Sequence, residues 1–201
     1  MIPYWPQPVW TLGPWTIHGF GVAQAVALVG GYALALRRAR SAGLDELQMG
    51  RLFVLALLVG LTVGFLVHHV VSGAPWSQPG ESAAGLTAGA LAIAVGAWAR
   101  WGASGLLYVD ALASVAPLVG GVARLGCFLA HDHRGRSSSG LFAVRFPEGP
   151  RIDLGLVECV IAFAVAGPVW WLWRSRPPAG AVATIVGVAS IGVRVVSSYL
   201  R

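Results

Sequence analysis

The chain has 201 residues, of which 56% are hydrophobic and only 11% are charged, and its mean hydropathy is +0.70. Soluble domains usually carry about 25% charged residues, so this composition excludes a soluble globular protein and predicts an all-α membrane protein. The net charge of +6 comes from arginine alone, because the chain has no lysine. These arginines stand at the ends of apolar segments, which favours topology signals and anionic lipid over nucleic acid as a partner.

Six stretches of the chain are apolar over roughly the 20 residues that a helix needs to cross a membrane. They predict a polytopic helical bundle that forms a single domain over residues 1–201, with a short outward-facing loop region. The predicted spans are Trp15–Leu36, Arg51–Val71, Ala83–Trp98, Leu106–Ala130, Gly155–Trp173 and Ala179–Tyr199.

The first ten residues have no basic region and no small-residue cleavage site, so we do not expect a signal peptide, and their Pro and Trp content suits the membrane interface. The fourth span is long and contains Asp110 and Pro117, so it either enters obliquely or is broken. We expect Asp110 to form a structural ion pair with Arg100.

Arginine placement predicts the orientation of the bundle. Three alternate connections carry arginine: the first holds Arg37, Arg38, Arg40 and Arg51, the third holds Arg100, and the fifth holds Arg174 and Arg176. These connections are therefore expected in the cytoplasm, and both termini, the 72–82 connection and the long segment 131–154 outside. That segment also carries Arg134, Arg136, Arg145 and Arg151. This outward excess of charge suggests an anionic ligand.

Two arginines lie near the outer ends of their spans, Arg124 in the fourth and Arg194 in the sixth. Both should reach the same depth of one leaflet, where guanidinium groups bind a lipid phosphate through paired hydrogen bonds. Gly126 is expected to open room beside Arg124. Snorkelling to the headgroups is the alternative for both arginines. Glu158, just inside the fifth span, needs a cationic partner, and we expect it to orient one of the two.

His131, Asp132 and His133 form a compact polar cluster directly after the fourth span. The cluster is compatible with a metal site, with acid–base chemistry in which Asp132 orients a histidine, or with a solvated loop. The tandem pair His68 and His69 ends the second span, and at most one of the two faces the bundle. Two further residues, Cys127 and Cys159, lie in apolar surroundings, so no disulfide framework is expected.

The frame Arg124-x-Gly126-x-Phe128, followed by Asp132 and Gly135, resembles the signature of prolipoprotein diacylglyceryl transferases. That family carries arginine, glycine, asparagine, phenylalanine, asparagine, glutamate and glycine in this order. Other stretches also resemble the family, namely His18–Gly21, Asp110–Pro117, Gly140–Pro147, Arg151–Glu158 and Gly192–Arg194.

The resemblance implies transfer of a diacylglyceryl group from phosphatidylglycerol to the lipobox cysteine of a prolipoprotein, on the periplasmic side of the bacterial inner membrane. It implies no cofactor. We assign catalysis to Arg124, Arg194, His133 and Asp132, with His133 as the base and His69 as second choice. Substrate contacts are assigned to Gly126, Cys127, His131, Gly135, Arg136, Glu158, His69 and Phe20.

Several positions depart from the family's pattern, and the chain ends where the family adds a seventh helix. The family's two asparagines, its glutamate, a tyrosine and an arginine are replaced by Cys127, Ala130, Asp132, Phe20 and Thr62, and its third-segment histidine is absent from residues 84–90. Three hypotheses therefore stay open. The chain is a diacylglyceryl transferase, a non-catalytic lipid-binding or assembly paralogue that keeps the two arginines, or a metal-assisted membrane hydrolase built on His131 and His133.

Overall fold

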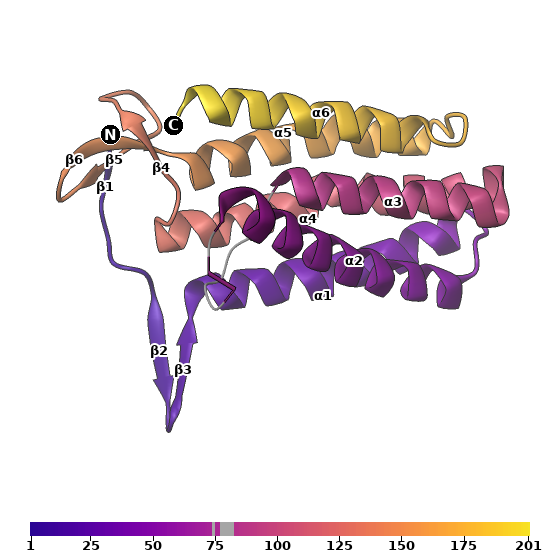
Figure 1. Cartoon of the computed structure of the whole chain (residues 1–201), viewed down its shortest axis with the longest axis horizontal. Helices are drawn as coiled ribbons and strands as arrows, with labels where there is room; N and C mark the ends of the chain where they lie inside the picture. The colour runs from indigo at the N-terminus through magenta and orange to yellow at the C-terminus, as the bar shows by residue number, and fades with distance from the viewer. Residues whose placement is uncertain (74, 77–82) are drawn as a thin grey trace.

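Six helices run side by side along the long axis of the molecule (Figure 1). The computed structural model describes residues 1–73, 75–76 and 83–201. The helices are α1 (Gly19–Ser41), α2 (Glu46–Ser72), α3 (Ala83–Trp101), α4 (Ala103–Ala130), α5 (Leu154–Arg174) and α6 (Ala181–Tyr199). Within the described residues, all of them except α3 are long and apolar enough to cross a membrane. The predicted helical membrane bundle is confirmed.

The ends of the bundle differ in content. The three arginine-bearing connections, α1–α2, α3–α4 and α5–α6, lie together at one end (Figure 1). Both termini and the α4–α5 segment lie at the other end. The helices therefore alternate in direction as the arginine pattern predicted.

Helix α4 is the centre of the bundle, because it contacts α1, α3, α5 and α6. Its buried face packs Tyr108, Ala111 and Val115 against small and apolar side chains of α1 and α2. A Cβ on Gly105 would lie 2.0 Å from the carbonyl oxygen of Ala97, so only glycine permits the close approach of α3 and α4. The helix is unbroken from Ala103 to Ala130 and accommodates Pro117, which decides against the alternative of a broken span.

Asp110 caps another helix. Its carboxylate accepts hydrogen bonds from the backbone N–H groups of Gly180 (2.7 Å) and Ala183 (2.8 Å) at the start of α6. The predicted ion pair with Arg100 is wrong, since the first turn of a helix offers unpaired N–H donors and a positive dipole end that satisfy a buried carboxylate. Asp110 therefore ties α4 to α6 at the arginine-loop end.

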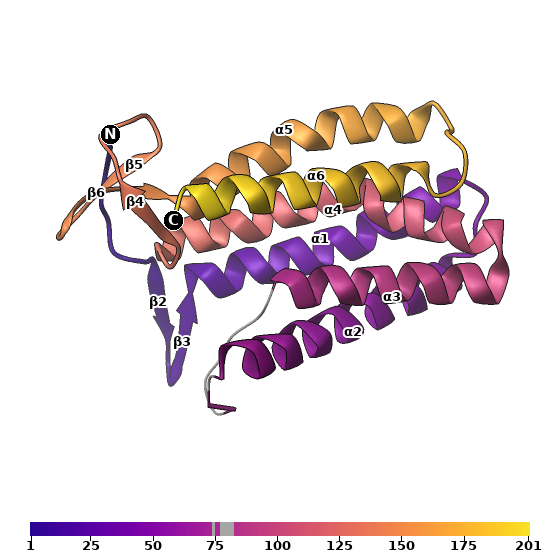
Figure 2. The same cartoon turned by 45° about the horizontal axis from the view of Figure 1, so that its top comes forward.

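The end of the bundle that carries both termini bears short strands rather than only loops. β1 (Ile2–Pro3), β4 (Arg134–Ser137), β5 (Ala143–Phe146) and β6 (Gly149–Asp153) form a sheet of order β1-β5-β6-β4. A separate hairpin, β2 (Val9–Leu12) with β3 (Trp15–His18), projects sideways from this end (Figures 1 and 2). Trp10 and Trp15 are exposed on it, as expected for an interfacial segment.

Candidate functional site

Two arginines from different helices share one buried glutamate. Arg124 Nε of α4 lies 2.7 Å from Oε2 of Glu158, and Arg194 Nη1 of α6 lies 3.7 Å from its Oε1. The Glu158 side chain is 5% exposed, and Ser197 donates a hydrogen bond of 2.6 Å to Oε1. The predicted convergence of the arginines, and the ion pair that orients one of them, are confirmed. We call these three charged residues the arginine clamp.

The arginine clamp stands at the polar end of a cavity of about 180 Å³ between α4, α5 and α6. The rest of the wall is apolar or small: Ala116, Pro117, Gly120, Ala162, Val165, Val186, Ala189, Ser190 and Val193. Val186 precedes Arg194 by about two turns, or about 12 Å along the helix axis. The cavity therefore combines a charged end with an apolar shaft, as a phospholipid requires. Two guanidinium groups and one carboxylate leave a net charge of +1 for an anion.

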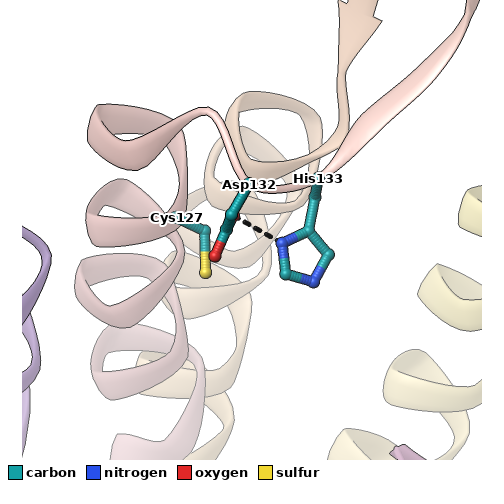
Figure 3. Close-up of side chains that lie close together, drawn as sticks. All are labelled: Cys127, Asp132 and His133. Atoms are coloured by element: carbon teal, nitrogen blue, oxygen red, sulfur yellow. Dashed lines mark hydrogen bonds and ion pairs between the residues drawn. The ribbon is translucent and has the colours of Figure 1, made fainter. Parts of the chain in front are cut away.

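Asp132 and His133 lie just beyond the end of α4 and turn back beside its last turn (Figure 3). Asp132 Oδ1 and His133 Nδ1 are 2.5 Å apart. The sulfur of Cys127 faces the same carboxylate (Figure 3) and is also 3.8 Å from Nη1 of Arg124. A helix that continued past Ala130 would have carried His133 away from Arg124 along the axis. The chain instead turns after Ala130, and Cys127 links the pair of Asp132 and His133 to the arginine clamp.

His131 does not join that pair. It ends α4 in a left-handed conformation with φ 51°, and its ring is 3% exposed. Its Nδ1 lies 2.7 Å from Oδ2 of Asp153, while Tyr4, Trp5, Phe128 and Phe146 surround it with ring centroids 4.9–5.5 Å away. The predicted compact cluster of three is wrong in this member, and the metal hypothesis built on His131 and His133 loses its ligand set. Burial raises the pKa of the Asp153 carboxyl, although the hydrogen bond from His131 acts in the opposite direction.

The two glycines of the signature serve backbone packing. A Cβ on Gly126 would lie 3.0 Å from Cβ of Ala23 in α1. The prediction that Gly126 opens room for a ligand is therefore wrong, because α1 fills that space. A Cβ on Gly135 would lie 2.5 Å from the carbonyl oxygen of Leu200. Both glycines therefore permit close backbone contact, and their assignment to substrate is replaced by a structural role.

The remaining arginines of segment 131–154 have internal partners or face outward. Arg134 pairs with Glu148 at 2.9 Å, and Arg151 donates to the carbonyl oxygen of Gly135 at 3.2 Å. Arg136 is exposed, and its backbone N–H, rather than its side chain, bonds to Leu200. The outward charge excess is thus used in part within the sheet, and the structure does not bring the Arg136 side chain to the arginine clamp.

His69 lies on α2, which contacts α1 and α3 and is separated from α5 and α6 by the middle of the bundle (Figure 2). Its ring is buried, stacks on Trp76 with centroids 5.0 Å apart, and has Nδ1 2.9 Å from the carbonyl oxygen of Phe65. His68 is only half-buried, so one of the tandem histidines faces inward as predicted. The structure gives His69 an aromatic packing environment remote from the arginine clamp.

Phe20 lines a second and wider cavity of about 590 Å³. The cavity opens between the β2–β3 hairpin, the start of α1 and the end of α4, and it is also lined by Gln7, Thr16, Ile17, His18, Gly21, Ala130 and Asp132. Asp132 therefore borders this cavity, and its side chain lies between Cys127 and His133 (Figure 3).

Sequence reasoning missed two residues that hold the site in place. Ser197 is 2% exposed and binds Glu158, but a serine in an apolar helix carries no distinguishing signal. Asp153 could have been found, because it stands directly before a helix as an N-cap residue and does accept the N–H of Leu156 at 3.1 Å. Both buried cysteines are free, as expected.

A bundle of apolar helices with two arginines on a buried carboxylate, at the mouth of an apolar cavity, defines a multi-pass membrane protein with an anion site in its helical layer. The model of the prolipoprotein diacylglyceryl transferase family matches residues 7–201, and the chain belongs to this family of bacterial transferases. It is similar to the phosphatidylglycerol–prolipoprotein diacylglyceryl transferase of Chromohalobacter salexigens, at 28% identity over 185 residues that cover 83% of this chain and 67% of the relative.

Proposed function

We propose that this protein transfers a diacylglyceryl group from phosphatidylglycerol, or a similar anionic phospholipid, to the lipobox cysteine thiol of a prolipoprotein. The observation that carries the proposal is the arginine clamp at the mouth of the cavity between α4, α5 and α6. The name of the Chromohalobacter relative supplies the two substrates. Because Cys127 stands where the family signature has asparagine, the activity has to be tested on this chain itself.

The arginine clamp suits the charge that develops during the reaction. A bound phosphodiester carries one negative charge, which balances the net +1 of the clamp. When a thiolate attacks the glycerol carbon, a C–S bond forms, the C–O bond to phosphate breaks, and glycerol phosphate leaves with a second negative charge. Arg124 and Arg194 stabilise that added charge, so their hydrogen bonds strengthen in the transition state and lower the barrier.

The acceptor thiol must lose a proton before it attacks, because the thiolate is the nucleophile. His133 takes this proton, and Asp132 holds the imidazole by the hydrogen bond at Nδ1 so that Nε2 is free to accept. The acceptor peptide approaches through the wider cavity that Phe20 and Asp132 line. The lipid and the acceptor thereby reach Cys127 and Arg124 from opposite sides of α4.

The reaction takes place at the outer face of the inner membrane. The three arginine-bearing connections lie at one end of the bundle, and arginine is enriched in cytoplasmic loops. The clamp, both termini and the small sheet belong to the opposite end, which therefore faces the periplasm.

The deciding experiment incubates the purified full-length protein with phosphatidylglycerol in mixed micelles and a lipobox peptide, and reads the peptide by mass spectrometry. We expect a diacylglyceryl adduct on the cysteine, strongly reduced with the Arg194→Lys variant and absent with a peptide whose cysteine is alanine. Phosphatidylglycerol binding without any adduct would instead establish the second candidate, a lipid-binding paralogue. The replacement of the signature asparagine by Cys127 favours that candidate.

A further inference from the structure

Three side chains that are typical metal ligands converge at the end of α4. One ligand atom each from Cys127, Asp132 and His133 lie within 4.8 Å of one another, and Figure 3 shows the sulfur and the imidazole on either side of the carboxylate. This set differs from the one expected from sequence, since His131 is directed to Asp153. It mixes sulfur, oxygen and nitrogen donors, which distinguishes it from an ordinary cluster of acids.

The distances are close to those of a tetrahedral site. Ligand bonds of about 2.0–2.3 Å place the ligand atoms about 3.3–3.6 Å apart. Asp132 and His133, now 2.5 Å apart in a hydrogen bond, have to separate by about 1 Å. The sulfur of Cys127 already lies within 4.8 Å of both ligand atoms, so it is at most a little over about 1 Å too far away. Rotation of exposed side chains achieves this, because the side chains of Asp132 and His133 are 39% and 37% exposed.

The backbone that carries these ligands is fixed on both sides. His131 is held by Asp153 and by aromatic rings before the pair. After the pair, the N–H of Leu154 bonds to the carbonyl oxygen of His133 at 2.9 Å. Only Asp132 and His133 lie between α4 with its cap and β4, so the ligands start from a restricted set of positions, which lowers the entropy cost of binding.

Charge and ligand type identify the occupant. A thiolate and a carboxylate neutralise a divalent cation, and a neutral imidazole completes three ligands. Thiolate and imidazole favour zinc and related transition metals, whereas magnesium and calcium take oxygen ligands. The nearby Arg124 is already paired with Glu158, and its Nη1 stands 3.8 Å from the sulfur as an outer hydrogen-bond donor.

We propose that Cys127, Asp132 and His133 bind a thiophilic divalent cation of the zinc type, with the fourth position open to water. Two of these ligands also act in the proposed function, His133 as the base and Asp132 as the residue that orients it. An occupied site therefore removes them from proton transfer and suppresses the transferase, a consequence that rests on the proposed function whereas the binding does not.

Binding is tested with Co²⁺ on the full-length protein in detergent, freed of any histidine tag. Thiolate ligation gives an intense near-ultraviolet charge-transfer band, and Zn²⁺ should displace it. We expect the band to vanish with Cys127→Ser and to persist with Cys159→Ala, the matched control for the other buried cysteine. His133→Ala should weaken binding by more than the roughly 10–100-fold that follows loss of an outer-shell partner.

The inference is overturned if wild-type protein gives no thiolate band, or if the band survives Cys127→Ser while the variant keeps the wild-type unfolding midpoint. Should Cys127→Ser fail to fold, His133→Ala and Asp132→Asn lie outside the helix and carry the same test. The adduct assay separates the two proposals. Zn²⁺ should abolish transfer and a chelator should restore it, whereas tight binding with undiminished transfer would leave the metal site standing and exclude His133 as the base.

Discussion

Replacing Glu158 by glutamine separates its two roles, as counter-charge and as hydrogen-bond acceptor. The amide keeps the size of the side chain and an oxygen for Ser197, but it removes the charge that balances Arg124 and Arg194. Breaking a fully buried ion pair costs about 3–5 kcal/mol. Because the Arg124 side chain is 21% exposed and Arg194 37%, water offsets part of this loss, and we expect unfolding free energy to fall by about 2–4 kcal/mol.

The same change should strengthen the response to anionic lipid. The net charge of the clamp rises from +1 to +2, so phosphatidylglycerol should raise the unfolding midpoint of Glu158→Gln more than that of the wild type. Both midpoints are read from tryptophan fluorescence in detergent, with and without the lipid. The exposed pair of Glu148 and Arg134 (57% and 44% exposed) provides the control. An ion pair in contact with water contributes little to stability, so Glu148→Gln should change the unfolding midpoint far less than Glu158→Gln does. Equal stability losses in the two variants, or no gain in lipid response, would refute this account of the clamp.

Three further predictions concern lipid, topology and pH. Arg124→Lys and Arg194→Lys keep the charge but lose the planar fork, so each should lose about 1.5–3 kcal/mol of phosphatidylglycerol binding; near-native binding by titration would leave the arginines as membrane anchors. The orientation is tested in a background in which both native cysteines are replaced. A cysteine at the exposed Ser139 should react with an impermeant thiol reagent in intact cells, whereas a cysteine at Ser41 should not. The reverse labelling pattern would overturn the orientation. Burial raises the pKa of Asp153 above its ordinary 3.8, so the folded chain holds this proton more tightly than the unfolded chain does. The contribution of this carboxyl to stability is therefore present below pH about 4 and declines as pH rises through the folded pKa. Asp153→Asn should flatten this part of the profile of unfolding midpoint against pH, and identical profiles for variant and wild type would contradict the argument.

The arginine clamp was predictable because it depends on helical periodicity and membrane depth. Arg124, Glu158 and Arg194 each stand near the same end of an apolar span, and charges at that depth are stabilised by pairing with one another. Because all three spans end at the same face of one membrane, residues near those ends lie at a similar depth. The sequence could not show which carboxylate oxygen each arginine contacts, or that Ser197 completes the set.

The position of Asp132 and His133 was less predictable because it depends on one backbone torsion angle. Residues 131–133 follow directly after α4, and continued helix would have carried both imidazoles away along the axis. The left-handed φ of 51° at His131 instead turns the chain. Non-glycine residues adopt this region at a cost, with histidine among the more tolerant. Nothing in the three-residue cluster indicates that a buried partner, Asp153, lies 22 residues later.

Asp110 illustrates the same limit at the other end of the bundle. A buried carboxylate has several ways to be satisfied, and sequence proximity favoured the cation at Arg100. Asp110 instead binds the start of α6 at Gly180, because two backbone N–H groups there lie within 2.8 Å of its carboxylate. Pairing with Arg100 would in addition cost the arginine side chain conformational entropy. Neighbours in sequence are therefore poor guides to the partners of buried polar groups.

The arginine clamp and the pair of Asp132 and His133 differ in how the fold holds them, and this difference has a mechanistic consequence. The arginine clamp is carried by three packed helices, which keep charged groups in place whether or not a ligand is bound. Asp132 and His133 are carried by a short link whose position depends on the buried contact between His131 and Asp153. In the proposed mechanism, in which His133 is the base, His131 is a positioning residue that acts through His133. In that mechanism, loosening the contact between His131 and Asp153 should impair proton transfer to His133 and leave lipid binding at Arg124 and Arg194 intact. The lipid then stays bound although the acceptor thiol is not deprotonated.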